Sequence, residues 1–201
     1  MPEYHRHLPH FHPEAVLLFL TWRLHGSLPA TYRLPTLQTP AQLFTAKDRF
    51  LDQRTTGPLW LSHPPIADLV ATTIRRGEFE RHFYELEAWV VMPNHVHILI
   101  HPLVAGPVLM RWLKGSTARA ANVILNRTGQ RFWQDESYDH YLRRNDKVGR
   151  TIAYIEQNPV KAGLATAAEQ WPWSSASRRK GGTGVSACRP AGPNACPTVR
   201  D

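Results

Sequence analysis

Two histidines stand two residues apart in the sequence His95-Val96-His97, within an apolar run. If this run is a strand, residues i and i+2 point to the same face, about 7 Å apart, so both imidazoles can bind one divalent metal ion. Two histidines leave the coordination shell of Mg²⁺, Mn²⁺ or Zn²⁺ incomplete, which requires a further ligand from elsewhere. The chain has 11 histidines. The alternative is therefore two ordinary polar residues on a half-exposed strand.

A second pair of residues offers the missing chemistry. Tyr154 and Asn158 are four residues apart, which places them on one face of a helix, a single turn from each other. Asn158 would give an oxygen to the metal, and Tyr154 would attack a phosphate that the metal polarises. The alternatives are an interface aromatic for Tyr154 and, for Asn158, a residue that ends the helix before Pro159.

The elements that must position these residues follow from hydrophobic periodicity and from the Pro and Gly breaks. Residues 16–24 form a strand that we expect to be central, and Pro93-Asn94 turns a hairpin between two later strands. The further elements expected are a short helix at 41–51, a helix at 66–79, strands at 83–92 and 95–101, a helix at 109–126, an extended segment at 132–142 and a helix at 146–162 that Pro159 kinks or ends early. This order predicts an α+β fold, with helices packed on a mostly antiparallel sheet.

Length and composition indicate a single globular domain. A chain of 201 residues can bury about 70% of its unfolded surface without disulfides. We assign residues 1–175 to the domain and residues 176–201, rich in Gly and Pro, to a flexible basic tail. The two cysteines match no metal or redox motif, so we treat them as incidental. No apolar run approaches a membrane span, and the N-terminus lacks the pattern of a secretory signal, so we expect a cytoplasmic protein with no membrane partner.

The charge favours a polyanionic partner. Lys and Arg outnumber Asp and Glu by 24 to 16, for a net charge of +8. Such an excess favours nucleic acid through phosphate neutralisation and counterion release. The predicted tail supplies about half of this excess, which is equally consistent with a solvated terminal segment.

The motifs resemble those of the REP-associated tyrosine transposases, relatives of the HUH-type single-strand transposases of insertion sequences. The histidine pair lies in MPNHVH at residues 92–97, and the tyrosine lies in YIEQNPVKAGL at residues 154–164. The resemblance extends over most of residues 5–175 and is looser at 31–64. Further matching blocks are residues 7–10, 113–122, 132–134, 137–140 and 171–175.

The resemblance implies a ferredoxin-like core of the HUH endonuclease type and a divalent metal, Mg²⁺ or Mn²⁺, bound by His95, His97 and Asn158. It implies that Tyr154 attacks single-stranded DNA, leaving a 5′-phosphotyrosine link and a free 3′-hydroxyl. Such a link retains the bond energy for rejoining, so no nucleotide cofactor is needed. The chain has no phosphate-binding glycine loop of the GxxxxGK type. His97 or His140 is a candidate for moving protons.

The resemblance also implies a DNA substrate that contains palindromic hairpins. The predicted DNA contacts are Lys114, Arg119, Asn122, Arg143, Arg150 and Lys161, with Arg144 beside them. Surface solvation is the alternative for each of these residues. Trp112, Trp133, Trp171 and Trp173 are candidates for stacking on unpaired bases, although core packing is the more common role of tryptophan.

Two other functions remain open from the sequence. A non-catalytic nucleic-acid-binding module of the same fold would bind DNA without a covalent adduct. A metal-dependent hydrolase would activate water and survive loss of the phenol. The sequence favours a monomer without excluding a dimer, and it does not specify the DNA sequence recognised.

Overall fold

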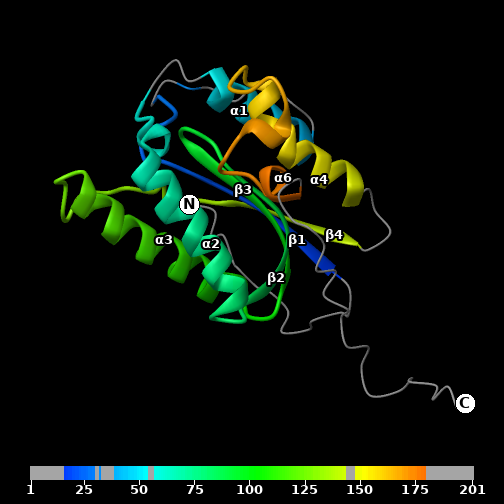
Figure 1. The fold of residues 1–201 in the computed structure, drawn as a ribbon, viewed down its shortest axis with the longest axis horizontal. Coiled ribbons are helices and arrows are strands. Elements are labelled where there is room, and N and C mark those ends of the chain that lie inside the picture. Colours follow the sequence, from blue (N-terminus) through cyan, green and yellow to red (C-terminus); the bar gives the residue numbers. More distant parts are fainter. Residues whose placement is uncertain (1–15, 30–31, 33–38, 54–56, 144–147, 180–201) are drawn as a thin grey trace, which may run out of the picture.

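One four-stranded antiparallel sheet forms the centre of the molecule (Figure 1). The computed structural model describes residues 16–29, 32, 39–53, 57–143 and 148–179. The strand order is β2-β3-β1-β4. The strands are β1 (Val16–Arg23), β2 (Tyr84–Val91), β3 (His95–Pro102) and β4 (Tyr138–Arg143). The first strand is therefore central, as its apolar run predicts, and the α+β fold class is confirmed.

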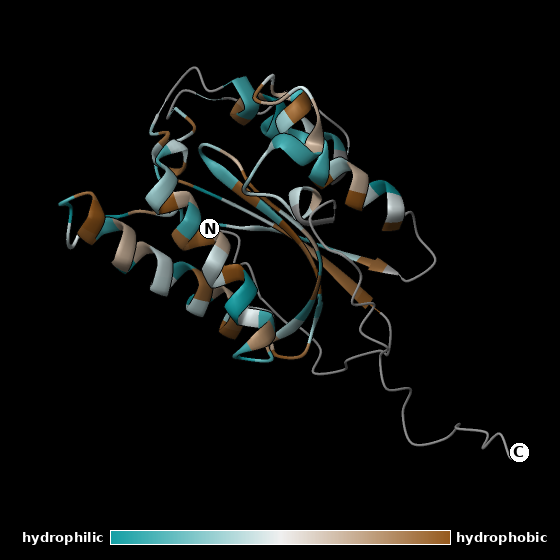
Figure 2. Ribbon diagram, in the orientation of Figure 1, coloured by the Kyte–Doolittle hydropathy of each residue, from teal (hydrophilic) through white to brown (hydrophobic). Residues whose placement is uncertain are grey.

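Two long helices cover one face of the sheet. They are α2 (Pro64–Phe79) and α3 (Gly106–Ile124), which pack against each other and against the even-numbered residues of β1, such as Leu18, Leu20 and Trp22. Hydrophobic residues run along the strands between the helix layers (Figure 2). This face holds the larger core and neither of the two candidate histidines.

The opposite face of the sheet is covered by α1 (Pro40–Gln53) and α4 (Val148–Glu156). Because side chains alternate along a strand, the odd-numbered residues Leu17, Phe19 and Leu99 point to this side and form a second, smaller core with Ile155 of α4. His95 and His97 share the parity of Leu99. The second face is therefore the one that carries candidate chemistry.

A glycine allows α2 to approach the sheet closely. Tyr84, at the start of β2, is buried, and its hydroxyl donates a hydrogen bond to the carbonyl of Ile74. A Cβ atom at Gly77 would overlap with the Tyr84 ring and hydroxyl. Only glycine leaves room for that aromatic side chain at this crossing.

The last predicted helix is interrupted where Pro159 requires it. The helix α4 ends at Glu156, and α5 (Asn158–Lys161) follows after Gln157. Proline has no N–H to donate, so the ladder of α4 cannot continue through this position. The start of this helix, which we expect at residue 146, lies outside the described residues.

The C-terminal part of the described chain returns to the sheet. Two short helices follow α5, η2 (Ala168–Gln170) and α6 (Ser175–Arg179), and Ser174 forms an isolated bridge with Val90 of β2. Ala176, the first residue of the expected tail, is buried within α6. Residues 180–201 lie outside the description, and the division into domain and tail stays a prediction.

One local expectation is wrong. Within the expected extended segment at 132–142, only Tyr138 onward joins the sheet, with a single bridge between Trp133 and Leu24 before it. A short 3₁₀ helix, η1 (Trp60–Ser62), precedes α2.

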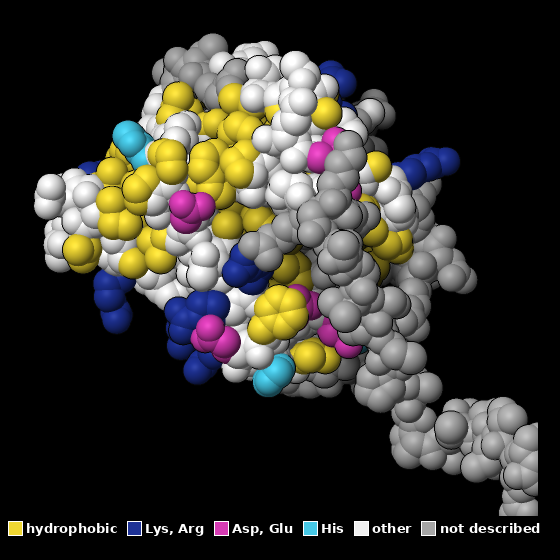
Figure 3. All heavy atoms as spheres, viewed as in Figure 1, with side chains coloured by type: hydrophobic (Ala, Val, Ile, Leu, Met, Phe, Trp, Pro, Cys, Tyr) yellow, Lys and Arg dark blue, Asp and Glu magenta, His cyan; other side chains and the backbone are white. Residues whose placement is uncertain are grey.

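Hydrophobic side chains gather over the region of α2 and α3 on the face shown in Figure 3.

None of the helices in the described ranges has the length and apolar character needed to cross a membrane.

Candidate functional site

The two histidines begin β3 in the middle of the sheet. His95 pairs with Arg23 and His97 with Thr21 of the neighbouring β1. Both side chains are fully buried, so they are not polar residues on a half-exposed strand. Their ring centroids lie 4.7 Å apart. Strand geometry thus brings the two imidazoles together as the spacing predicts.

A carboxylate that sequence reasoning missed completes the cluster. Asp48 of α1 is buried, and its Oδ1 lies 3.2 Å from Nε2 of His97 and 3.7 Å from Nε2 of His95. The ligand atoms of these three residues all lie within 4.8 Å of one another. Asp52, one turn later, has its Oδ1 3.9 Å from Nε2 of His95. The helix α1 therefore brings acidic oxygen to the two imidazoles.

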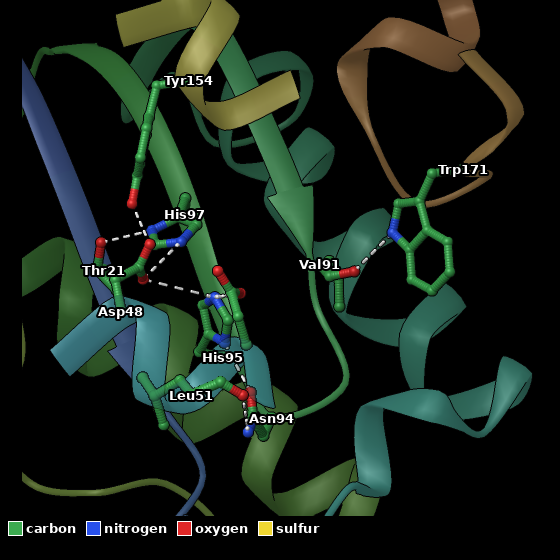
Figure 4. A network of polar contacts seen from close by, with 10 residues as sticks. Thr21, Asp48, Leu51, Val91, Asn94, His95, His97, Tyr154 and Trp171 are labelled. Carbon is green, nitrogen blue, oxygen red and sulfur yellow. Dashed lines mark hydrogen bonds and ion pairs between the residues drawn. The ribbon is translucent and has the colours of Figure 1, made fainter. Parts of the chain in front are cut away.

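A chain of hydrogen bonds orients each ring (Figure 4). The side-chain amide of Asn94 donates to the carbonyl of Leu51 over 2.9 Å, which leaves its Oδ1 facing Nδ1 of His95 at 2.6 Å. That nitrogen must then carry the proton, so the Nε2 lone pair of His95 points into the cluster. Nδ1 of His97 lies 2.7 Å from the hydroxyl of Thr21, and this hydrogen bond holds the second ring in place.

The residues present fit a divalent cation. Within the described part of the chain, Nε2 of both histidines and Oδ1 of Asp48 are buried and have no hydrogen-bond partner. Leaving a buried polar atom unpaired costs about 1–3 kcal/mol, so three such atoms facing one another call for a shared partner. Imidazole nitrogen with carboxylate oxygen is a donor set that divalent metals accept, and orienting bonds to the far ring nitrogens are typical of metal-binding histidines.

The candidate nucleophile lies beside this cluster. The hydroxyl of Tyr154, on α4, donates a hydrogen bond to Oδ2 of Asp48. Its ring packs edge-on against His97 at 5.9 Å and against Phe19 at 6.3 Å. The ammonium of Lys161 lies 4.6 Å from the centre of the Tyr154 ring. Asp48 thus contacts the phenol through one oxygen and the histidines through the other.

Electrostatics at the site holds the phenol neutral. Burial raises the pKa of Tyr154, the charges of Asp48 and Asp52 and the bond to Asp48 raise it further, and a hydrogen bond with Asn158 works against them. Asn158 is itself buried. The predicted turn between Tyr154 and Asn158 therefore places both polar groups together, although α4 ends between them.

The acid and the first histidine are also shifted. Burial alone raises the pKa of Asp48, but the charges of His97 and His95 and the bond from Tyr154 outweigh it, so the pKa lies well below its usual range. Burial and the charge of His97 lower the pKa of His95 to about 3, against the opposing charge of Asp48. A neutral His95 and an ionised Asp48 are the forms that bind metal.

Comparison with known proteins adds family evidence to this geometry. Residues 67–158 match the family of IS200-like transposases. The matched segment contains the β2–β3 hairpin with both histidines and ends at Asn158. The resemblance to REP-associated tyrosine transposases that the motifs indicate is confirmed by the curated relatives and the solved structure described next.

The curated relatives are REP-associated tyrosine transposases. The chain is 30% identical over 98 residues to one of Escherichia coli (strain K12), a match covering 47% of this chain and 56% of the relative. It is 27% identical over 110 residues to a relative in Haemophilus influenzae, covering 49% and 62%. The chain therefore spans little more than half the length of the curated relatives that it matches.

A solved structure shares the fold of the whole domain. It is a REP-associated tyrosine transposase bound to a REP hairpin, and it superimposes with a TM-score of 0.56 at 19% identity, covering 90% of this chain and 86% of the other. This superposition shows that the two chains share a fold over most of their length. The carboxylate of Asp48 lies outside the matched family segment.

The predicted DNA contacts are spread over the molecule. Lys114 donates hydrogen bonds to the carbonyls of Gln134, Asp135 and Glu136 at 3.0, 3.0 and 3.4 Å, so it already supports the segment before β4. Asn122 is buried and donates to the carbonyl of Gln130. Both residues have structural roles in this transposase-like fold. DNA contacts through them stay predictions.

The remaining predicted contacts are basic residues on several elements. Arg119 and Arg150 are exposed on α3 and α4, and Lys161 is exposed beside Tyr154. Arg143 ends β4, and Arg144 lies outside the described residues. Arg119 belongs to the helix layer opposite the tyrosine. These cations therefore do not form one track in the described structure, and their role in DNA binding stays a prediction.

Three of the candidate tryptophans have partners for their indole N–H groups. Trp133 is buried and donates to the Thr117 hydroxyl, Trp171 donates to the carbonyl of Val91, and Trp173 donates to Asp68. Trp112 packs edge-on against Phe83. Their packing favours a core role. His140, a candidate for moving protons, is exposed on β4 and stacks with Tyr138.

Proposed function

We propose that this chain is a tyrosine transposase that nicks and rejoins single-stranded DNA through Tyr154. The observation that carries the proposal is the carboxylate of Asp48, which contacts the Tyr154 hydroxyl and both histidines at once. A binding module has no physical need to bury a phenol, a carboxylate and two imidazoles together. Similarity to IS200-like transposases over residues 67–158 supports the same reaction class.

The proposed reaction is a transesterification. The phenol oxygen of Tyr154 bonds to the scissile phosphorus, and the bond from phosphorus to the 3′ oxygen breaks. The products are a 5′-phosphotyrosine and a 3′-hydroxyl, and the departing oxygen takes up a proton. Attack by a 3′-hydroxyl on the phosphotyrosine reverses these steps and rejoins a strand.

Asp48 is positioned to orient the phenol. Its Oδ2 accepts the hydrogen bond of Tyr154, which fixes the direction of the phenol oxygen beside the histidines. Lys161, whose ammonium lies over the ring, would favour the phenolate that forms. Burial at the same time keeps the phenol neutral until the substrate phosphate is present.

Asp48, His95 and His97 would hold a divalent cation, Mg²⁺ or Mn²⁺, and Asn158 is the further ligand that the motif predicts. When bound, such a cation supplies a positive charge that polarises the scissile phosphate. Asn94 and Thr21 hold the two imidazole rings in place through hydrogen bonds to their Nδ1 atoms.

We propose a single-stranded substrate that carries a palindromic hairpin. One of the solved structures similar to this chain is described as bound to a REP hairpin. The chain carries a net charge of +8, which favours a polyanion. We further propose that the protein acts in the cytoplasm, where such DNA is available, and as a monomer.

The test is a denaturing gel of the full-length chain with labelled single-stranded DNA hairpins, with Mn²⁺ or Mg²⁺ and with chelator. We expect a metal-dependent protein–DNA band in the wild type and none in Tyr154→Phe. The exposed Tyr141, on β4, provides the matched control, and Tyr141→Phe should retain the band.

Two other outcomes of this assay would indicate a different function. Cleavage that persists in Tyr154→Phe without an adduct would point to a metal-dependent hydrolase. Binding of the hairpin without cleavage in any metal would point to a regulatory module of the same fold.

A further inference from the structure

A cavity of about 120 Å³ opens between α1, the end of β1 and the segment that leads into β4. Its lining includes Asp48 and Thr21, which also belong to the cluster of histidines. The cavity and the candidate metal site are therefore neighbours that share the Asp48 side chain. A strand whose phosphate lay at the cluster would have its adjoining nucleotide at this cavity.

Two cations line the cavity side by side. Arg23 ends β1, and Lys47 precedes Asp48 on α1. Both side chains line the same cavity, so two positive charges face one confined space. Among the described residues, Lys47 has no hydrogen-bond or ion-pair partner. The Arg23 guanidinium donates a hydrogen bond to the Ser27 hydroxyl over 3.3 Å. A bound anion would offset these positive charges.

An aromatic wall stands beside the cations. The rings of Phe44 and Tyr138, which also line the cavity, stack with centroids 4.3 Å apart. Tyr138 lies on β4 opposite Thr21, and Phe44 lies one turn before Asp48. A nucleobase can stack on an aromatic surface of this kind, and single-strand binders gain about 1–3 kcal/mol per stacked base.

The remaining wall is held from the far side of the sheet. Glu136 and Ser137 line the cavity, and Lys114 of α3 binds the carbonyls of residues 134–136. The negative charge of Glu136 partly offsets the positive charges of Arg23 and Lys47. Lys114 therefore holds in place the backbone that leads into this side of the cavity.

We propose that this cavity binds the one nucleotide of the substrate strand that adjoins the scissile phosphate, with its base against Phe44 and Tyr138 and its phosphate between Arg23 and Lys47. The inference rests on the proposed nicking function, since it takes the scissile phosphate to lie at the Asp48–His95–His97 cluster. It gives Arg23 and Lys47 a role in substrate positioning that the matched motifs do not contain.

The test measures binding without chemistry, in chelator, by fluorescence anisotropy of a labelled hairpin oligonucleotide with the full-length protein. Lys47→Gln and Arg23→Gln should each weaken binding about tenfold at ~0.1 M salt, and each should reduce the slope of log affinity against log salt by about 0.7. Arg111→Gln, an exposed position on α3, is the matched control and should leave affinity unchanged. Lys47→Arg should restore binding, which separates loss of charge from loss of fold.

A second series replaces single nucleotides of the oligonucleotide by abasic sites. We expect one position next to the nick to lose affinity in the wild type and to lose much less in Lys47→Gln, because both changes disrupt the same contact. Equal affinities of Lys47→Gln, Arg23→Gln and the Arg111→Gln control would overturn the proposal. So would tighter binding of free nucleoside monophosphate or inorganic phosphate than of the strand.

The two proposals fail in different assays. Absence of a Tyr154-dependent adduct with any hairpin overturns the proposed function. A normal adduct with unchanged affinity in both cavity variants overturns only the nucleotide site.

Discussion

Asp48 links the candidate metal site to the candidate nucleophile at the scale of single residues. One carboxylate oxygen faces the histidines and the other accepts the Tyr154 hydrogen bond. Replacing it therefore changes two properties together, the affinity for a cation and the environment of the phenol. Asp48→Asn keeps the shape of the side chain and removes its charge, which makes it the informative substitution.

We predict that Asp48→Asn lowers the affinity for Mn²⁺ at least tenfold, because a neutral amide replaces an anionic ligand. The adduct with DNA should fall in parallel, since the phenol loses the charged group that orients it. Isothermal titration calorimetry measures the first effect and the denaturing gel the second. Asp139→Asn, an exposed change on β4, should alter neither. Wild-type Mn²⁺ affinity in Asp48→Asn would remove Asp48 from the metal site.

The buried imidazole of His95 predicts a pH dependence of stability in the absence of metal. Its pKa falls from 6.5 to about 3 on folding. Between these values the unfolded chain binds more protons than the folded chain, so the free energy of unfolding rises with pH and is lost as pH falls through this window. The lowered pKa of Asp48 acts with the same sign, at pH values below its usual range.

We expect His95 to contribute a slope of up to about 1.4 kcal/mol per pH unit between pH 4.5 and 6. Urea unfolding in chelator measures it, and His95→Asn should flatten the curve. Substituting the exposed His140 by Asn provides the comparison and should keep the wild-type slope. An unchanged slope in His95→Asn would mean that another group titrates.

At the scale of elements, Asn94 joins the β2–β3 hairpin to α1. Its amide donates to the carbonyl of Leu51, and its oxygen orients His95. We predict that Asn94→Ala lowers Mn²⁺ affinity about 10–100-fold, the usual effect of removing a group that orients a metal ligand. Calorimetry tests it, with Asn126→Ala in the turn after α3 as control. Metal affinity equal to wild type would show that packing alone positions the ring.

The close crossing of α2 and β2 gives a prediction about stability. Gly77→Ala should destabilise the fold by about 1–3 kcal/mol or more, because the new methyl group meets the Tyr84 ring. Gly115→Ala, on α3 with open space around it, should stabilise by up to about 1 kcal/mol through helix propensity. Thermal unfolding of both variants measures the contrast. Equal effects would mean that the ring moves aside at little cost.

Most elements were predictable from the sequence because their patterns are local. Three such patterns are the apolar run in residues 16–24, the Pro93-Asn94 turn and the break at Pro159. Each of them acts over a few residues. The spacing of His95 and His97 likewise determines that both share one face. The helix at 41–51 was also visible in outline, but its place against the sheet was not.

The contribution of Asp48 was not predictable in this way. It lies 47 residues before His95 on a helix within an irregular stretch, and nothing local states which surface that helix covers. One sequence feature could have indicated that Asp48 faces the sheet. It lies one turn from Phe44 and one turn from Leu51, on the apolar side of the helix. The same reasoning explains Lys114, whose partners are carbonyls 20 to 22 residues away.

For the whole molecule, the sheet separates a structural layer from a chemical one. The larger core lies with α2 and α3, and the candidate site lies with α1 and α4. Substitutions on the two sides should therefore have different consequences, even when they cost similar free energy of unfolding.

We predict that Leu109→Ala, in the buried face of α3, lowers stability by about 2–5 kcal/mol and leaves Mn²⁺ affinity of the folded protein within twofold of wild type. Ile155→Ala, next to Tyr154 in the smaller core, should lower stability similarly and also reduce adduct yield, since it loosens α4. Urea unfolding and the adduct gel together measure both. Loss of metal affinity in Leu109→Ala would show that the layers are coupled.

The order of the site residues along the chain has a consequence for protein synthesis. Translation produces Asp48 and then the two histidines before α4. A chain that stops between residues 97 and 148 would therefore carry three of the proposed metal ligands but lack both Tyr154 and Ile155, which packs in the smaller core beside them. Such a fragment would lack the proposed nucleophile and also part of the packing that buries the cluster.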